Sequence, residues 1–362
     1  MTERVFNFNP GPATLPLPVL EEAQAELLNY KHTGMSVMEI SHRSKEYEAI
    51  NTEAQALTKE LLGLPDNYKV LFLQGGASTQ FAAVPLNLLP SDATADYILT
   101  GSWSEKAYKE ASKFGKTHVA ASTKEENFTR IPALNEIKLS EAPAYVHITS
   151  NNTIFGTEWQ TFPEFDNIPV IADMSSDMLS RPFDATKFAL IYAGAQKNLG
   201  PAGVTMVIIR NDLLEKVNTS APTMLRYDIH AQKDSLYNTP PVFAVYMLSL
   251  VLKWIKTNGG LAAMAKRNAE KAAYVYEAID NSNGFYRGHA VKDSRSLMNI
   301  TFRLPSEDLE KAFAAEAASE GLIGLKGHRS VGGIRASVYN AMSVEGCKTL
   351  AQFMVHFQQK NN

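Results

Sequence analysis

Short apolar runs recur along the segment from residue 70 to residue 210, and turn residues or helical stretches separate most of them. Several runs are continuously apolar instead of alternating, which is typical of strands that helices cover on both faces. This pattern predicts an α/β domain. The predicted strands are Val70–Leu73, Tyr97–Leu99, Ala144–Ile148, Val170–Ala172, Ala189–Tyr192 and Val204–Ile209.

Helical patterns flank this segment. Before it, helices are predicted from Pro18 to about Tyr30 and from about Lys45 to Leu62, where Gly63 and Pro65 supply the stop signal. The pattern predicts a large α/β domain of residues 16–258 and a small α+β domain of residues 1–15 and 259–362. After the strands come helices at Val242 to about Lys256 and about Leu261 to Ile279, a strand at Leu297–Phe302, a helix at about Ser306–Ser319, a glycine-rich stretch at 321–340 and a helix to about Phe357.

The composition of the 362 residues narrows the function classes. With 45% hydrophobic and 20% charged residues the chain has the makeup of a globular protein, and its net charge of -3 argues against binding to nucleic acid. The most apolar window, Val242 to Ile255, is shorter than the roughly 20 residues of a bilayer crossing. The single cysteine, Cys347, excludes an intrachain disulfide and a cysteine zinc cluster. We expect a cytoplasmic protein without a secretory signal, a membrane segment or a metal site.

Polar or aromatic residues that could bind a ligand or take part in catalysis follow the predicted strands in chain order. Each alone has an ordinary interpretation as a turn, a helix cap or a core residue. Open α/β sheets bind ligands beyond the carboxyl ends of their strands, so the set together indicates one site. The set comprises the stretch QGGAST at 74–79, Trp103, Thr153, Asp173 and Lys197.

Lys197 lies in a turn between two apolar strands, where a semi-buried amine can form a Schiff base. Asp173 stands 24 residues earlier and can hold a pyridine nitrogen protonated, which is the pairing that pyridoxal phosphate (PLP) enzymes use. The glycines at 75–76 and the following helix start suit a phosphate, although no GxxxxGK[ST] motif is present. The indole of Trp103 can stack on a heteroaromatic ring, and the hydroxyl of Thr153 can bond its phenolic oxygen.

Two groups of basic residues remain. The first is His42 and Arg43, and the second is His328, Arg329 and Arg335. Their ordinary interpretation is a helix-start loop and a solvated glycine-rich loop. Three cations or potential cations within eight residues instead suit an anionic ligand, and an arginine holds a carboxylate with two parallel hydrogen bonds.

The chain resembles the phosphoserine aminotransferases, which are class-V aminotransferases and fold-type I PLP enzymes. The resemblance runs essentially end to end and implies a homodimer whose large domain has a mainly parallel seven-stranded sheet flanked by helices, with a smaller α+β domain. The sequence differs from that of some relatives at Asn9 and Pro10 and at Ala77–Ser78. The motifs that carry it are FNFNPGPATLP, GMSVMEISHRS, GGASTQF, TGSWS, AGAQKNLGPAG, YNTPP and GHRSVGGIRASVYNAM.

The resemblance also implies roles for single residues. Lys197 would form the Schiff base with PLP, Asp173 would face the ring nitrogen, Trp103 would stack on the ring and Thr153 would reach its hydroxyl. Arg335 would bind the substrate α-carboxylate. The phosphate of PLP would lie on Ala77, Ser78 and Gln196 and on Asn238 and Thr239 of the partner subunit, and the distal anion of the substrate on His42, Arg43, His328 and Arg329.

The implied reaction moves the amino group of L-glutamate to 3-phosphohydroxypyruvate by a ping-pong mechanism, in serine biosynthesis. For bacterial members of the family, the resemblance also allows the longer phosphorylated keto acid of vitamin B6 synthesis as a second acceptor. Two alternatives stay open. A desulfurase needs a mobile cysteine, for which Cys347 in the last predicted helix is a poor candidate. A binding protein for a phosphorylated small molecule needs no Schiff base, so it would be colourless and unaffected by borohydride.

Overall fold

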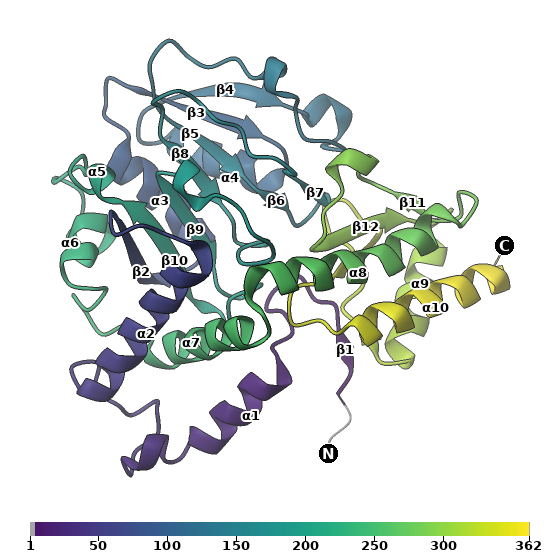
Figure 1. The fold of residues 1–362 in the computed structure, drawn as a ribbon. Helices are drawn as coiled ribbons and strands as arrows, with labels where there is room; N and C mark the ends of the chain where they lie inside the picture. The colour runs from purple at the N-terminus through teal and green to yellow at the C-terminus, as the bar shows by residue number, and fades with distance from the viewer. Residues whose placement is uncertain (1–3, 362) are drawn as a thin grey trace.

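The computed structural model describes residues 4–361 of the chain (Figure 1). Its largest element is a seven-stranded sheet with the strand order β2-β10-β9-β8-β5-β3-β4. The strands are β2 (Tyr68–Gly75), β3 (Thr94–Leu99), β4 (Lys116–Ser122), β5 (Pro143–Thr149), β8 (Val170–Asp173), β9 (Leu190–Gly194) and β10 (Gly203–Arg210).

Neighbouring strands of this sheet run parallel except at β10, which pairs antiparallel with both β2 and β9. Two antiparallel pairings restore the direction, so β2 runs the same way as β9. The carboxyl ends of six strands therefore meet at one edge. The predicted fold class is confirmed, and all six predicted apolar runs are strands. The prediction lacks β4, because this edge strand buries only Ala120 and its sequence KTHVAAS is largely polar or small.

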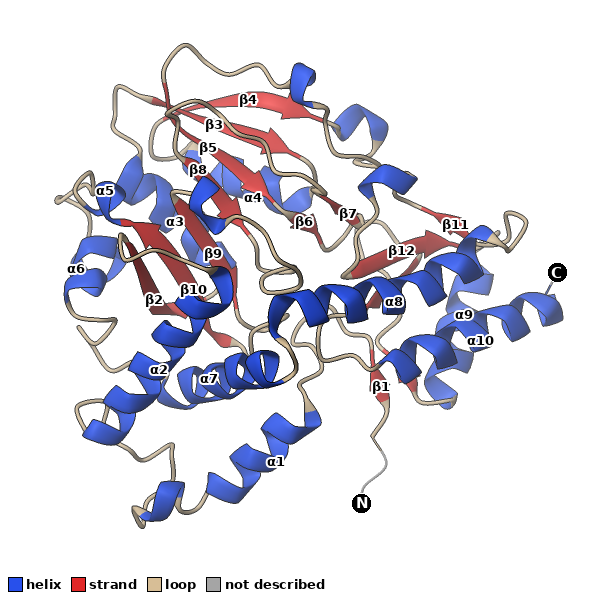
Figure 2. Ribbon diagram, in the orientation of Figure 1, coloured by secondary structure: helices blue, strands red, loops and turns tan. Residues whose placement is uncertain are grey.

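Helices cover both faces of the large sheet (Figure 2). One face packs against α1, α2 and α7, and the other packs against α3, α4, α5 and α6. Burial from both sides explains why the central strands read as unbroken apolar runs. These helices are α1 (Leu17–Glu26), α2 (Lys45–Leu62), α3 (Ala77–Leu88), α4 (Ser102–Ala111), α5 (Asn211–Leu214), α6 (Tyr227–Gln232) and α7 (Val242–Thr257).

The ends of α2 follow the sequence signals closely. Ser44 caps its start by accepting a hydrogen bond from the Tyr47 amide at 3.4 Å, and Gly63 ends it in the left-handed conformation with φ 62°. By contrast, α1 ends at Glu26 instead of about residue 30. The chain beyond it forms a short 3-10 turn, Tyr30–His32, inside which Lys31 takes a positive φ of 45°.

A second, smaller group of strands and helices stands beside the large sheet (Figure 1). Its apolar core joins α8, α9 and α10 to the three-stranded sheet and to Phe8 near the N-terminus. The glycine-rich stretch holds the strands β13 and β14, which the prediction lacks because they are two and four residues long. The elements are β1 (Phe6–Asn7) paired with β13 (Leu322–Ile323), the sheet β11 (Arg287–Gly288), β12 (Asn299–Arg303) and β14 (Ile334–Ser337), and α8 (Gly260–Asp280), α9 (Glu307–Ser319) and α10 (Val344–Asn361).

The predicted domain boundary between residues 258 and 259 stays a prediction, and residues 1–3 of the predicted small domain lie outside the described residues. The most apolar helix, α7, is buried along most of its length, as predicted. Within residues 4–361, no helix combines the length and the apolar content that a membrane crossing requires.

Candidate active site

The large sheet brings the predicted site residues to one edge. Ala77 opens α3 directly after β2, and Trp103 is the second residue of α4 after β3. Thr153 follows β5 and the two-residue strand β6 (Asn151–Asn152), Asp173 is the last residue of β8, and Lys197 lies between β9 and β10. The arrangement is the one expected for a ligand site at the carboxyl edge of an open α/β sheet.

The amine of Lys197 is held inside this site. Its Nζ donates a hydrogen bond to Thr153 Oγ1 at 2.6 Å and lies 5.7 Å from the centre of the Trp103 ring. Burial lowers the pKa of Lys197 to about 8; nearby Arg335 adds to this effect and Asp173 opposes it. An ammonium with this pKa loses its proton readily near neutral pH, which a lysine needs in order to act as a nucleophile or base.

Asp173 is a buried carboxylate with only 5% of its surface exposed. Burial raises its pKa, while Lys197 and hydrogen bonds from Ser175 lower it. One carboxylate oxygen, Oδ1, accepts a hydrogen bond from the Ser175 amide at 2.9 Å, so Asp173 does cap the following segment. Among the described residues Oδ2 has no hydrogen-bond partner, which leaves it for a ligand.

The start of α3 and the turn before Lys197 form a polar cradle around Gly194. A Cβ atom at residue 194 would lie 3.3 Å from the Ala77 amide nitrogen and 2.9 Å from Gln196 Oε1, so a side chain there would crowd both groups. Gly76, at the N-cap of α3, provides no side-chain cap, and Ser78 is exposed. Free amides at a helix start, beside a carboxamide, suit an anion.

Arg335 reaches the same site from β14. It is 6% exposed, and its Nη1 donates a hydrogen bond to the Thr153 carbonyl oxygen at 3.4 Å. Its Nε is buried and has no partner among the described residues. A buried guanidinium with an unused donor is prepared for an anionic ligand, because an unmade hydrogen bond to a buried charge is costly.

Arg335 shares a cavity of about 220 Å³ with His328. Burial lowers the pKa of the His328 imidazole, and the nearby charges of Arg335, Lys106 and Arg329 lower it further. Arg329 lies on the outer side of the same loop and lines a neighbouring cavity of about 680 Å³. The basic group formed by His328, Arg329 and Arg335 therefore lies beside the Lys197 site.

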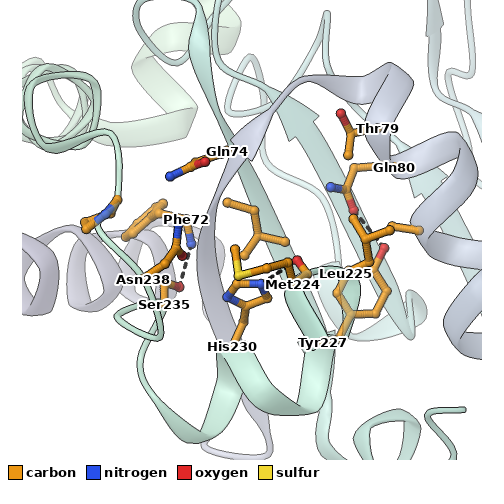
Figure 3. A pocket seen from close by; sticks show the side chains of 13 residues that line it. Phe72, Gln74, Thr79, Gln80, Met224, Leu225, Tyr227, His230, Ser235 and Asn238 are labelled. Atoms are coloured by element: carbon orange, nitrogen blue, oxygen red, sulfur yellow. Dashed lines mark hydrogen bonds between the residues drawn. The ribbon is translucent and has the colours of Figure 1, made fainter. Parts of the chain in front are cut away.

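Four predicted residues lie elsewhere. Asn238 lines a separate cavity of about 200 Å³ at the free edge of β2, where Figure 3 shows it near Phe72 and across from Gln80. The carbonyl oxygen of Thr239 accepts a hydrogen bond from Gln74 Nε2 at 2.7 Å. His42 and Arg43 lie in the loop before α2. Within residues 4–361, no hydrogen bond, ion pair or cavity joins these four residues to Lys197.

The sequence analysis missed three buried asparagines next to the site. Each donates a hydrogen bond from its side-chain amide nitrogen to one of three consecutive backbone carbonyl oxygens in the turn after Asp173. Asn268 occupies a position on the apolar face of α8, with Met264 before it and Ala272 after it, and this polar interruption is the only signal in the sequence. The three bonds are Asn198 to Met178 at 3.1 Å, Asn340 to Leu179 at 2.9 Å and Asn268 to Ser180 at 2.9 Å.

These asparagines also bond one another. Asn198 Oδ1 accepts a hydrogen bond from the backbone amide of Asn340 at 2.9 Å, and Asn340 Oδ1 accepts one from Asn268 Nδ2 at 2.7 Å. Since Asn198 directly follows Lys197, the network ties the lysine turn to α8 and to the segment after β14. We refer to Asn198, Asn268 and Asn340 as the asparagine triad.

Comparisons with known proteins identify the family of the chain. The family model for class-V aminotransferases matches residues 5–350. The phosphoserine aminotransferase of Herpetosiphon aurantiacus is 63% identical over 98% of this chain and 99% of its own length. A solved phosphoserine aminotransferase from Bacillus circulans subsp. alkalophilus is 57% identical, covers all of both chains and has a TM-score of 0.98. A PLP-bound phosphoserine aminotransferase from Trichomonas vaginalis is 42% identical over 97% of this chain and 100% of its own, with a TM-score of 0.93. The chain therefore belongs to the phosphoserine aminotransferases of the class-V aminotransferase family.

Proposed function

We propose that this chain transfers the amino group of L-glutamate to 3-phosphohydroxypyruvate, and that Lys197 and Asp173 are its catalytic residues. As a member of its family it is a PLP-dependent transaminase. The observation that carries the assignment of residues is the amine of Lys197, which stands 2.6 Å from Thr153 Oγ1 with its pKa lowered to about 8.

The residues at the sheet edge fit PLP in three separate ways. The Ala77 amide and the Gln196 side chain meet around Gly194, where they suit a phosphate. The Trp103 ring lies within reach of Lys197 and offers a flat face for a pyridine ring. The unpartnered Oδ2 of Asp173 suits a protonated ring nitrogen. Lys197 would hold the cofactor covalently through Nζ, with Thr153 near its phenolic oxygen.

Bound PLP supplies an electron-accepting ring that stabilises negative charge at the substrate α-carbon. The Lys197 amine is the general base that removes the proton from that carbon and then delivers a proton for the next step. Its lowered pKa suits both directions of transfer. Asp173, as a buried anion, keeps the ring nitrogen positively charged, because an opposite charge at close range favours the protonated form.

Arg335 would bind the α-carboxylate that glutamate and the keto acid share. The distal anion is a phosphate in one substrate and a carboxylate in the other, and His328 and Arg329 would meet it. His328 lines the Arg335 cavity, and both residues line the neighbouring cavity. Cys347 is fully buried, and burial raises the pKa of its thiol to about 12. This thiol cannot serve as the nucleophile of a desulfurase.

The proposal includes a homodimer. Asn238 and Thr239 of the partner subunit would complete the phosphate site, and the partner's His42 and Arg43 would meet the distal anion. In support, Asn238 and Thr239 stand at the outer edge of β2, beside the exposed apolar side chains of Met224 and Tyr237. Exposed apolar groups beside polar ones are typical of a protein interface.

The test is a stoichiometric assay of the purified holoenzyme. Glutamate and 3-phosphohydroxypyruvate should yield O-phosphoserine and 2-oxoglutarate in equal amounts, and pyruvate should be a far poorer acceptor because it lacks the phosphate. The variant Lys197→Ala should form no product, whereas Lys216→Ala, which removes an exposed lysine, should react like the parent. Equal kcat/KM values for pyruvate and the phosphorylated acceptor would contradict the proposed substrate, and an active Lys197→Ala would contradict the assigned base.

A further inference from the structure

A second buried carboxylate lies directly behind Asp173. Asp177 is 6% exposed and stands in the turn that follows β8. Glu158, at the end of the two-residue strand β7 (Thr157–Glu158), is 1% exposed and close enough to influence Asp177. Three acidic side chains therefore share one buried region, and each ionised carboxylate there needs a compensating charge.

Within residues 4–361, two cations compensate these three acids. Arg181 Nε lies 3.2 Å from Glu158 Oε1, and the other two guanidinium nitrogens of Arg181 donate to backbone carbonyl oxygens. The charges of Lys197 and Asp173 favour each other, and Asp177 has a smaller effect on the pKa of Lys197. Among the described residues no cation lies within ion-pair distance of Asp177. The simplest charge balance leaves Asp177 neutral.

The hydrogen bonds of Ser150 fit a neutral Asp177. Ser150 Oγ lies 3.0 Å from the Asp173 carbonyl oxygen and also within hydrogen-bond distance of Asp177 Oδ1. A serine hydroxyl has one hydrogen to donate, and a backbone carbonyl can only accept. If the hydroxyl donates to Asp173, the contact with Asp177 needs a hydrogen that comes from the Asp177 carboxyl group.

We propose that Asp177 is a positioning residue that keeps its proton in the working enzyme and donates it in a hydrogen bond to Ser150. Through Ser150, whose amide also donates to the Asp173 carbonyl oxygen at 3.0 Å, this bond fixes the end of β8 and so the Asp173 side chain. A neutral Asp177 also leaves Asp173 as the single anion behind the ring nitrogen. The positioning role rests on the function of Asp173 proposed above.

The proton on Asp177 should be lost as the pH rises. Burial and the negative charge of Glu158 raise the pKa of Asp177 to about 7, while Ser150 and Arg181 lower it and Asp173 raises it. Lys197 and the hydroxyl of Tyr339 are the other titratable groups that sense it. Above this pH Ser150 has two acceptors for one hydrogen, and a second negative charge appears beside Asp173.

Infrared spectroscopy of the holoenzyme tests this assignment without relying on activity. The carbonyl stretching band of a protonated carboxylic acid should be present at pH 6 and should disappear with a midpoint near 7. The band should be absent in Asp177→Asn and present in Asp184→Asn, which removes an exposed carboxylate. If the band persists in Asp177→Asn, the proton does not reside on Asp177 and the proposal is wrong.

The rate of the half-reaction with glutamate tests the positioning role. An asparagine at 177 is neutral and can still donate to Ser150, so Asp177→Asn should keep most of the rate at pH 6. The parent's rate should decline above pH 7 as Asp177 loses its proton, and Asp177→Asn should lack this decline. Asp177→Ala lacks the donor and should react roughly 5- to 100-fold more slowly. Equal pH profiles for the parent and Asp177→Asn would refute the role. If the parent itself does not transaminate, the proposed function fails, while the infrared band still decides where the proton lies.

Discussion

Replacing Arg335 with methionine is the most direct test of how the site recognises its substrates. Methionine fills a similar volume but has neither charge nor hydrogen-bond donors. In the parent, Arg335 is buried and its Nε has no partner, so the arginine side chain is available for a carboxylate. Both substrates carry this group at the same position relative to the reacting carbon. The variant should therefore lose affinity for both of them.

The size of the loss follows from the burial of the pair. Removing one partner of a buried, hydrogen-bonded ion pair costs about 3–5 kcal/mol, which corresponds to roughly a 150- to 4,000-fold fall in kcat/KM. Arg335→Lys keeps the charge but lacks the planar fork. Losing one of two charge-assisted hydrogen bonds costs about 1.5–3 kcal/mol, so this variant should lose roughly 10- to 150-fold.

Steady-state kinetics should measure kcat/KM for glutamate and for 3-phosphohydroxypyruvate separately. The control is Arg287→Met, which makes the same change at an exposed arginine. Circular dichroism and the amount of bound cofactor should stay unchanged in all three variants, because none of them alters the residues assigned to PLP. Values of kcat/KM within about threefold of the parent for both substrates would show that Arg335 does not bind the α-carboxylate.

Three further predictions concern single buried groups. Asp173→Asn removes the anion behind the ring nitrogen and should slow the half-reaction by more than about tenfold in stopped-flow absorbance, and a rate within twofold of the parent would exclude the role. Lys271 is fully buried, donates to the carbonyl oxygens of Val338 at 2.8 Å and Tyr339 at 2.6 Å, and has its pKa lowered to about 7 by burial. Above pH 7 the unfolded chain therefore binds a proton that the folded protein lacks, so the unfolding free energy of the parent should rise by about 2 kcal/mol relative to that of Lys271→Met between pH 7 and 9. Urea titrations measure this difference, and equal pH dependence of the two proteins would contradict it. The buried thiol of Cys347 should resist a thiol reagent in the folded protein and react after unfolding, so rapid labelling of the native enzyme would count against its burial.

The strands of the large sheet were predictable because burial on both faces leaves a signal that depends only on local sequence. The common location of five site residues was predictable for a related reason, since a residue at the end of a parallel strand lies at a known edge of the sheet. These residues are Ala77, Trp103, Thr153, Asp173 and Lys197. The edge strand β4 and the short strands β13 and β14 lack this signal, because few of the residues in β4 are buried and the other two are only two and four residues long.

The asparagine triad and the proton on Asp177 depend on contacts between distant parts of the chain. Asn198 and Asn340 are 142 residues apart, and no pattern in the sequence states which carbonyl each amide will meet. The positions of Asn238, Thr239, His42 and Arg43 illustrate a different limit. The roles predicted for Asn238 and Thr239, and the role proposed above for His42 and Arg43, require a second subunit, so the fold of one chain does not test them.

The asparagine triad has a mechanical consequence for any closing of the smaller sheet over the substrate. Asn268 lies in the first half of α8, whereas the far end of that helix, at Asp280, makes no bond to the turn after Asp173. Sliding α8 as a whole would break the bonds from Asn268 to Ser180 and to Asn340 together and leave the Ser180 carbonyl oxygen buried without this donor. Tilting the helix about Asn268 would break neither bond. The turn at 178–180 is therefore expected to act as a hinge point, with the outer end of α8 making the largest excursion.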